Sequence, residues 1–118
     1  MDHYIFTYGT LMKDRYRSSV LDEAEYTGDA VLENHALLEL GAYPGAVFKE
    51  GSKVFGEVYR ISEEKKRELD YIEGEGYLYK YEYADVVCNG RKLKVGFYRY
   101  LRDDGSHAFF EEDGKWHD

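Results

Sequence analysis

The chain contains few of the residues that usually carry covalent, redox or metal chemistry. Its 118 residues include one cysteine, Cys88, which excludes an internal disulfide. Cys88 lies in a predicted strand without electropositive neighbours and is interpreted as core filler. The histidines at positions 3, 35, 107 and 117 lack metal-ligand spacing, and there is no Walker loop and no GxGxxG motif. We therefore expect a reaction, if there is one, to need no metal, no cofactor and no covalent nucleophile.

Long apolar runs and basic clusters are also missing. No stretch approaches the roughly 20 apolar residues that span a bilayer, and Met1-Asp2-His3 does not begin a signal peptide. The net charge is −8, from 24 acidic and 16 basic residues, and no run of Lys or Arg could follow a phosphate backbone. We expect a cytoplasmic protein that binds neither nucleic acid nor membranes. The composition leaves the oligomeric state open.

Aromatic side chains, in contrast, are abundant. Aromatics make up 17% of the chain, and 13 of them are tyrosines. Tyrosine suits half-buried strands, and its hydroxyl can line a polar cavity. The count favours a β-rich domain with a pocket, although most of these tyrosines are expected only to pack the sheet.

The residue pattern predicts five or six strands and one well-formed helix. The expected strands are Tyr4–Tyr8, Ala30–Leu40 (as one or two strands), Lys53–Ile61, Tyr79–Val87 and Lys92–Tyr100. A turn is expected over residues 41–45, a short helix over Lys13–Leu21, and a hairpin at Asn89-Gly90. This is a single small α+β domain, residues 1–118, with a core of about 4–100 and an acidic C-terminal tail of 101–118. A short sheet of this kind often closes into a barrel, which hides its edges.

The predicted helix ends in a carboxylate of special interest. Ser62 can cap the helix, and Gly74 ends it. Glu73 follows Leu69 by four positions, so it lies on or beside the face that packs inward. Burial and the negative end of the helix dipole would both raise its pKa, which suits a group that takes and returns a proton. The alternative is an ordinary solvated glutamate.

Other carboxylates are less distinctive. Asp70, Glu75 and Glu82 are interpreted as structural or solvated.

The turn after the first strand is the second candidate feature. Gly9 would let the backbone approach a ligand closely, and successive amides of such a turn can form a nest that binds a carboxylate. A plain strand-ending turn is the alternative.

Two motifs together resemble a known family. Phe6-Thr7-Tyr8-Gly9-Thr10-Leu11 resembles a YGxL motif, and Leu69-Asp70-Tyr71-Ile72-Glu73-Gly74 resembles an LDxxEG motif. The pair is similar to that of the γ-glutamylcyclotransferase-like family, which includes γ-glutamylamine cyclotransferases and plant avirulence-induced proteins. The resemblance covers about residues 4 to 100, without the acidic tail.

The resemblance implies a fold and a set of roles. It implies a small mixed β-barrel with flanking helices and a cavity at the barrel mouth. It implies that the loop of Tyr8, Gly9, Thr10 and Leu11 binds the glutamyl head of a small-molecule substrate and that Glu73 is the catalytic acid/base. Tyr79 matches a family tyrosine near the pocket. The implied product is 5-oxoproline, released together with an amine that the sequence does not identify.

Three other hypotheses remain open at this point. The chain could be a binding module that senses a γ-glutamyl-like metabolite without converting it. It could catalyse a different acyl-transfer or lyase step on a γ-glutamyl-tagged compound. It could also be an interaction protein that acts through its acidic tail.

Overall fold

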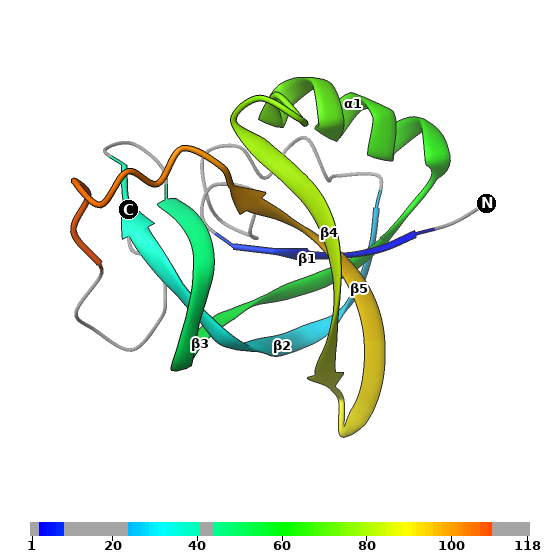
Figure 1. Cartoon of the computed structure of the whole chain (residues 1–118). Helices are drawn as coiled ribbons and strands as arrows, with labels where there is room; N and C mark the ends of the chain where they lie inside the picture. Colours follow the sequence, from blue (N-terminus) through cyan, green and yellow to red (C-terminus); the bar gives the residue numbers. More distant parts are fainter. Residues whose placement is uncertain (1–2, 9–23, 41–43, 110–118) are drawn as a thin grey trace.

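The computed structural model describes residues 3–8, 24–40 and 44–109 of the chain. These residues form five strands and one helix, in the order β1 (His3–Thr7), β2 (Glu25–Glu39), β3 (Pro44–Ile61), α1 (Glu63–Glu73), β4 (Tyr79–Cys88) and β5 (Arg91–Tyr100). Figure 1 shows the strands curling into a barrel, with α1 lying across one side of it. The predicted helix over Lys13–Leu21 lies outside the described residues.

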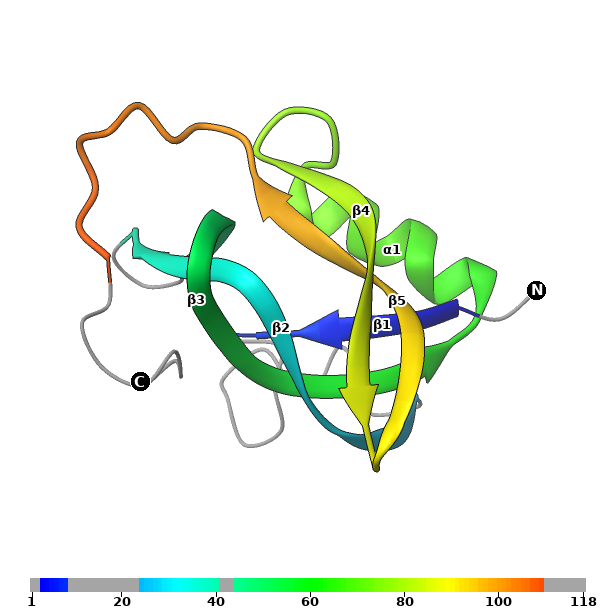
Figure 2. The same cartoon turned by 60° about the horizontal axis from the view of Figure 1, so that its bottom comes forward.

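The sheet is a closed barrel with the strand order β1-β3-β2-β4-β5. The neighbouring strands along this order are antiparallel. Closure is made by parallel pairings of β5, which meets β1 at Ile5↔Gly96 and β3 at Ala46↔Arg99. Figure 2 shows β1 running between β3 and β5 at this closure. The barrel is therefore mixed, as the family resemblance implied.

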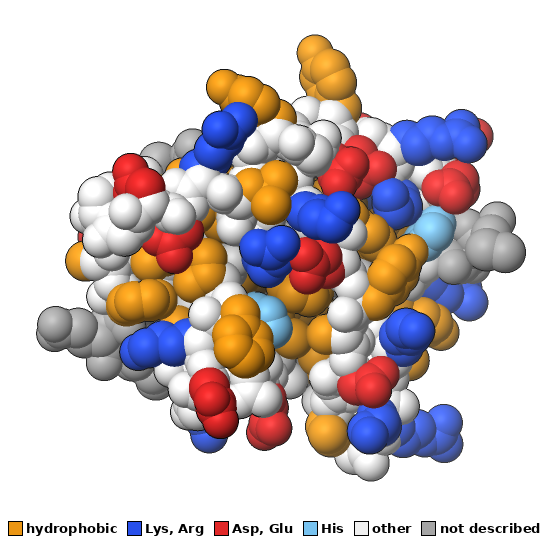
Figure 3. Space-filling model, in the orientation of Figure 1, with side chains coloured by type: hydrophobic (Ala, Val, Ile, Leu, Met, Phe, Trp, Pro, Cys, Tyr) orange, Lys and Arg blue, Asp and Glu red, His pale blue; other side chains and the backbone are white. Residues whose placement is uncertain are grey.

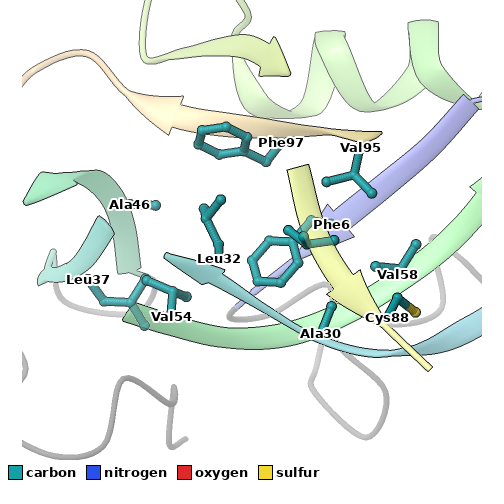
Figure 4. Close-up of a cluster of buried hydrophobic side chains, with 11 residues drawn as sticks. Phe6, Ala30, Leu32, Leu37, Ala46, Val54, Val58, Cys88, Val95 and Phe97 are labelled. Atoms are coloured by element: carbon teal, nitrogen blue, oxygen red, sulfur yellow. The ribbon is translucent and has the colours of Figure 1, made fainter. Parts of the chain in front are cut away.

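The barrel interior holds the main apolar cluster. Figure 4 shows these side chains converging from all five strands: Phe6, Ala30, Leu32, Leu37, Ala46, Val54, Val58, Val86, Cys88, Val95 and Phe97. Phe6 and Phe97 are each 1% exposed. Cys88 belongs to this cluster and is 4% exposed, so its interpretation as core filler is confirmed.

A second apolar cluster lies between the barrel and α1. Leu69 of the helix is completely buried there against Ile5, Tyr59 and Tyr98. The C-terminal half of β3 thus has Val54 and Val58 inside the barrel and Tyr59 and Ile61 under the helix. Burial on both faces explains why the polar–apolar alternation of this strand is imperfect.

The ends of α1 agree with the predicted caps. The Ser62 hydroxyl accepts a hydrogen bond from the Lys65 amide at 3.1 Å, and the acidic first turn suits the positive end of the helix dipole. Gly74 takes a left-handed conformation with φ 60°, and its amide bonds carbonyls of the last turn. On the inner side of the helix Leu69 is buried, and Ile72 is half-buried.

The hairpin at Asn89-Gly90 is confirmed. Both residues have positive φ, 54° and 76°, as a two-residue turn between twisted strands requires. This turn joins β4 to β5 in a regular ten-pair register.

The prediction of a turn over residues 41–45 is wrong at its last two positions. Pro44 and Gly45 are the first residues of β3 and pair with Glu39 and Leu38. A proline is tolerated at the first residue of a strand, where its missing N–H breaks no ladder. The first half of the turn, residues 41–43, lies outside the described residues.

Strands β2 and β3 are longer than predicted. The extra residues of β2, 25–29, pair with the end of β3, and the extra residues of β3 begin at Pro44 and pair with the end of β2. The hairpin bends where the register shifts between Glu33 and His35. At the bend, the Gly51 amide donates to the Asn34 side chain at 3.1 Å. The first half of β3 was hidden in the sequence because its exposed residues 48–51 interrupt the apolar pattern between the buried residues 44–47 and the predicted strand.

Two further observations complete the fold. Within the described residues, no helix has the length and apolar character needed to cross a bilayer. Phe109 pairs with Leu38 through an isolated bridge, so this part of the acidic tail lies against β2.

Gly56 offers a test of how tightly β1 packs on β3. A Cβ atom here would lie 2.2 Å from the Thr7 carbonyl oxygen and 2.6 Å from the Phe6 ring. We expect Gly56→Ala to lower the free energy of unfolding by about 1–3 kcal/mol, because backbone cannot yield as a flexible side chain can. Urea unfolding followed by circular dichroism measures it. The exposed Glu50→Ala on the same strand is the control, and equal stability of the two variants would contradict this packing.

Candidate functional site

The end of the helix and the end of the first strand lie close together. Glu73 is the last residue of α1, and Tyr8 directly follows β1. Burial raises the pKa of the Tyr8 hydroxyl far above its usual range, the Ala46 amide opposes this, and the negative charge of Glu73 raises the pKa further. The charge of Glu73 also contributes to a raised pKa at Tyr98, after burial and Asp70. The half-buried Glu73 carboxylate is thus within electrostatic reach of the strand end where the first motif begins.

The Tyr8 side chain is fixed by two main-chain contacts. Its hydroxyl donates to the Tyr98 carbonyl oxygen at 2.5 Å and accepts a hydrogen bond from the Ala46 amide at 3.0 Å. Both the proton and an acceptor site of this hydroxyl are therefore engaged. Tyr8 joins β3 and β5 at the point where the two strands come together.

Tyr79 has a similar role. It is 5% exposed, and its hydroxyl donates to the Pro44 carbonyl oxygen at 2.8 Å. The loop between α1 and Tyr79 is tight, because the Gly76 amide bonds the Tyr79 carbonyl and the Leu78 amide bonds the Gly74 carbonyl. The two tyrosines implied by the family resemblance thus both hold the first residues of β3.

Asp70 ties the helix to the barrel. One carboxylate oxygen accepts a hydrogen bond from the Tyr98 hydroxyl at 2.6 Å, and the other pairs with the Lys66 ammonium at 2.8 Å. Lys66 in turn lies 4.2 Å from the centre of the Tyr81 ring. Asp70 precedes Glu73 by three residues, nearly one turn of helix, so its contacts also determine where Glu73 lies.

The other predicted binding residues, Gly9, Thr10 and Leu11, lie outside the described residues. The amide nest expected for this turn therefore stays a prediction, as does a raised pKa at Glu73. Among the described residues, no three His, Cys, Asp or Glu side chains come together as a metal-ligand group would.

This geometry defines a class of protein. Its described residues form a small mixed barrel with one helix packed outside, and a half-buried carboxylate ends that helix close to Tyr8, which directly follows the first strand. A half-buried carboxylate is a group that can take and return a proton.

Comparison with known proteins identifies the family. The family model described as "Gamma-glutamyl cyclotransferase, AIG2-like" matches residues 5–118. The γ-glutamylcyclotransferase family protein YtfP of Escherichia coli K12 is 36% identical over 115 residues, which are 97% of this chain and 96% of YtfP. The protein of the same description from Citrobacter rodentium is 40% identical over 114 residues, 97% and 95% of the two chains. The chain belongs to the AIG2-like γ-glutamylcyclotransferase family.

Solved structures agree with this assignment. The solution structure of E. coli ytfP is 32% identical, covers 96% of this chain and 95% of its own, and superposes with a TM-score of 0.73. An AIG2-like protein from Mus musculus, 24% identical, covers 93% and 86% of the two chains with a TM-score of 0.79 and so shares the fold. The family match also runs to residue 118, so it includes the acidic tail that the motif resemblance did not cover.

Sequence reasoning missed two residues of this arrangement. Tyr98 was one strand tyrosine among many, and its pairing with Asp70 depends on a tertiary contact between α1 and β5. Ala46 contributes only its main-chain amide, which leaves no side-chain signal in a sequence. The interpretation of Asp70 as structural agrees with its contacts.

The Asp70 contacts give a stability prediction. Asp70→Ala leaves the Tyr98 hydroxyl and the Lys66 ammonium without their partner, so we expect a loss of about 1–3 kcal/mol in the free energy of unfolding. Chemical denaturation measures it. Glu68→Ala is the matched control on the same helix, because Glu68 pairs with Lys65 at a more exposed site and should cost less than about 1 kcal/mol. Indistinguishable variants would mean that Asp70 does not anchor the helix.

The raised tyrosine pKa values predict loss of stability at alkaline pH. In the unfolded chain these hydroxyls ionise near pH 10. In the folded chain burial keeps Tyr8 and Tyr98 protonated to higher pH, so their contribution to stability is complete below pH 10 and is lost as pH rises above it.

A tyrosinate absorbance titration alongside unfolding measurements checks this sign. We expect a smaller alkaline loss of stability in Tyr98→Phe than in the parent protein. Tyr71→Phe is the control, because Tyr71 is 89% exposed and should leave the pH profile unchanged. Stability that stays constant up to pH 12 would contradict the burial of these hydroxyls.

Proposed function

We propose that this chain is a γ-glutamylcyclotransferase that converts a γ-glutamyl compound to 5-oxoproline and a free amine. The observation that carries the proposal is the position of Glu73, half-buried at the end of α1 and close enough to Tyr8 for its charge to act on the hydroxyl. Membership of the family and the family names of its relatives support the reaction type.

The reaction needs one reactant and one proton carrier. The α-amine of the glutamyl group attacks its own γ-carbonyl carbon, a five-membered ring forms, and the bond to the departing nitrogen breaks. Because nucleophile and carbonyl belong to one molecule, the enzyme has only to hold it in a reactive shape, which can lower the barrier by up to about 7–11 kcal/mol.

In this proposal Glu73 moves the proton. An α-amine is mostly protonated near pH 7, so a base must first make it nucleophilic. Glu73 takes that proton and then delivers it to the leaving nitrogen, a shuttle worth about 10²–10⁴-fold in rate. Its half-buried position at the negative end of the helix favours the uptake of a proton.

The tyrosines have a supporting role in this mechanism. The Tyr8 hydroxyl already donates to the Tyr98 carbonyl and accepts from the Ala46 amide, so it is committed to the frame of the site. We assign it the task of fixing the start of the turn Gly9–Leu11, whose amides would bind the carboxylate of the glutamyl head. Tyr79, bonded to Pro44, holds the same end of β3 two residues earlier.

The rival function is a binding module that recognises a γ-glutamyl-like metabolite without converting it. A pure binder has no need for a proton carrier at the end of α1, which favours catalysis. Release of 5-oxoproline from a panel of γ-glutamyl amines separates the two functions and also identifies the leaving amine.

Substitution of Glu73 tests the mechanism. We expect Glu73→Gln to lower the rate of 5-oxoproline release by at least about 10²-fold, because the amide cannot exchange a proton as a carboxylate does. Ligand-induced thermal shift should show that the variant is folded and still binds the substrate. Glu64→Gln, an exposed site in the first turn of the same helix, is the control and should retain full activity. A Glu73→Gln variant with parental turnover would refute the assignment.

A further inference from the structure

A second pocket lies on the outside of the barrel. It has a volume of about 340 Å³ and is lined by His3, Tyr4, Tyr81, Tyr83, Lys94 and Gly96. None of these residues belongs to the site proposed for the cyclisation. The volume is at the lower end of the range for small-ligand sites, so one or two fused rings would fit.

The pocket exists because two strands separate. Within the described residues, β1 and β5 are in register at a single pair, Ile5↔Gly96. The lining residues His3 and Tyr4 precede Ile5, and Lys94 precedes Gly96, so the pocket opens on the N-terminal side of that pair. A regular parallel ladder would have continued here and filled the gap.

Gly96 forms part of the floor by leaving room for a ring. A Cβ atom at position 96 would lie 2.0 Å from the hydroxyl end of Tyr81, so only glycine lets this ring lie flat on β5. The buried Tyr81 hydroxyl has no hydrogen-bond partner among the described residues. Buried polar groups are usually paired, so this hydroxyl is an unsatisfied polar group beside Gly96.

The walls suit a flat aromatic ligand. Tyr83 is 59% exposed and Tyr4 is 37% exposed, and Tyr81 meets Tyr83 edge to face at 5.4 Å between ring centres. Tyrosine rings of this kind pack well against another ring. Figure 3 shows hydrophobic side chains, a class that includes tyrosine, set among charged ones on the face of the molecule that it displays.

The charged side chains at the rim of the pocket would orient a bound ligand. The Lys94 ammonium lies 5.9 Å from the centre of the Tyr83 ring, and no ion pair of the described residues includes it. His3 instead contacts the Glu63 carboxylate at 3.3 Å. An anionic group would therefore be attracted to the Lys94 end and repelled from the Glu63 end. Screening beyond about 8–10 Å keeps the net negative charge of the chain from overriding this local preference.

We propose that this pocket binds a flat aromatic carboxylate, with the ring between the tyrosines and the carboxylate at Lys94. The ligand belongs to a chemical class different from the γ-glutamyl substrate, and its site is separate from Glu73. The test of this proposal is therefore independent of whether the chain catalyses the cyclisation.

Titration of the ¹⁵N-labelled full chain with 2-naphthoate tests the pocket directly. We expect saturable shifts of the Tyr4, Lys94 and Gly96 amides with a Kd of about 1 mM or below, as the ligand's size allows. We expect the parent protein to bind the uncharged 2-naphthamide at least about fivefold more weakly than 2-naphthoate. The Lys94→Met variant should bind 2-naphthoate at least about fivefold more weakly than the parent protein does. Lys92→Met, on the same strand but outside the pocket, should bind as the parent does.

Two further variants complete the test. Tyr83→Ala removes one wall at an exposed position, and we expect it to abolish saturable binding. Glu73→Gln should bind 2-naphthoate as the parent does, which separates this pocket from the proposed catalytic site. Shifts that do not saturate, that centre on other residues, or that are equal for the acid, the amide and Lys94→Met would overturn the proposal.

Discussion

The hydrogen bond from the Tyr98 hydroxyl to the Asp70 carboxylate joins the helix to the barrel, and the site is built outward from it. Through the Tyr98 carbonyl the same residue holds the Tyr8 hydroxyl, which in turn holds the Ala46 amide. One short chain of contacts thus links α1, β5, the end of β1 and the start of β3. Because each member is buried or half-buried, loss of one leaves its partner unsatisfied in a poorly solvated place.

Apolar and polar contacts contribute differently to the position of Glu73. Leu69 is buried among Ile5, Tyr59 and Tyr98 and supplies the attraction that keeps α1 against the sheet, but apolar packing has little directional preference. The Asp70 hydrogen bonds supply the direction. The proton transfer proposed for Glu73 would need both, since a displacement of about 1 Å between carboxylate and ligand is enough to cost much of a catalytic effect.

The sequence predicted those features that depend on neighbours along the chain. The Ser62 cap, the Gly74 end of the helix and the Asn89-Gly90 hairpin are local, and the structure contains all three. The two motifs predicted the family through residues that lie some sixty positions apart. The first half of β3 was missed because the exposed residues 48–51 interrupt its apolar pattern, although Ala46 before them lies in the core. The partners of Tyr8 and Asp70 were missed because one is a main-chain amide and the others lie on distant strands.

The closure of the barrel at Ile5↔Gly96 has a consequence for how the chain assembles. The β2–β3 and β4–β5 hairpins join residues that are near in sequence, whereas this seam joins residues about 90 positions apart, where loop entropy is greatest. The two hairpins can form early at small entropic cost. The pairing of the first strand with β5 can complete the barrel only after the two hairpins have paired with each other. The seam between the first strand and β5 is then the last part of the barrel to form.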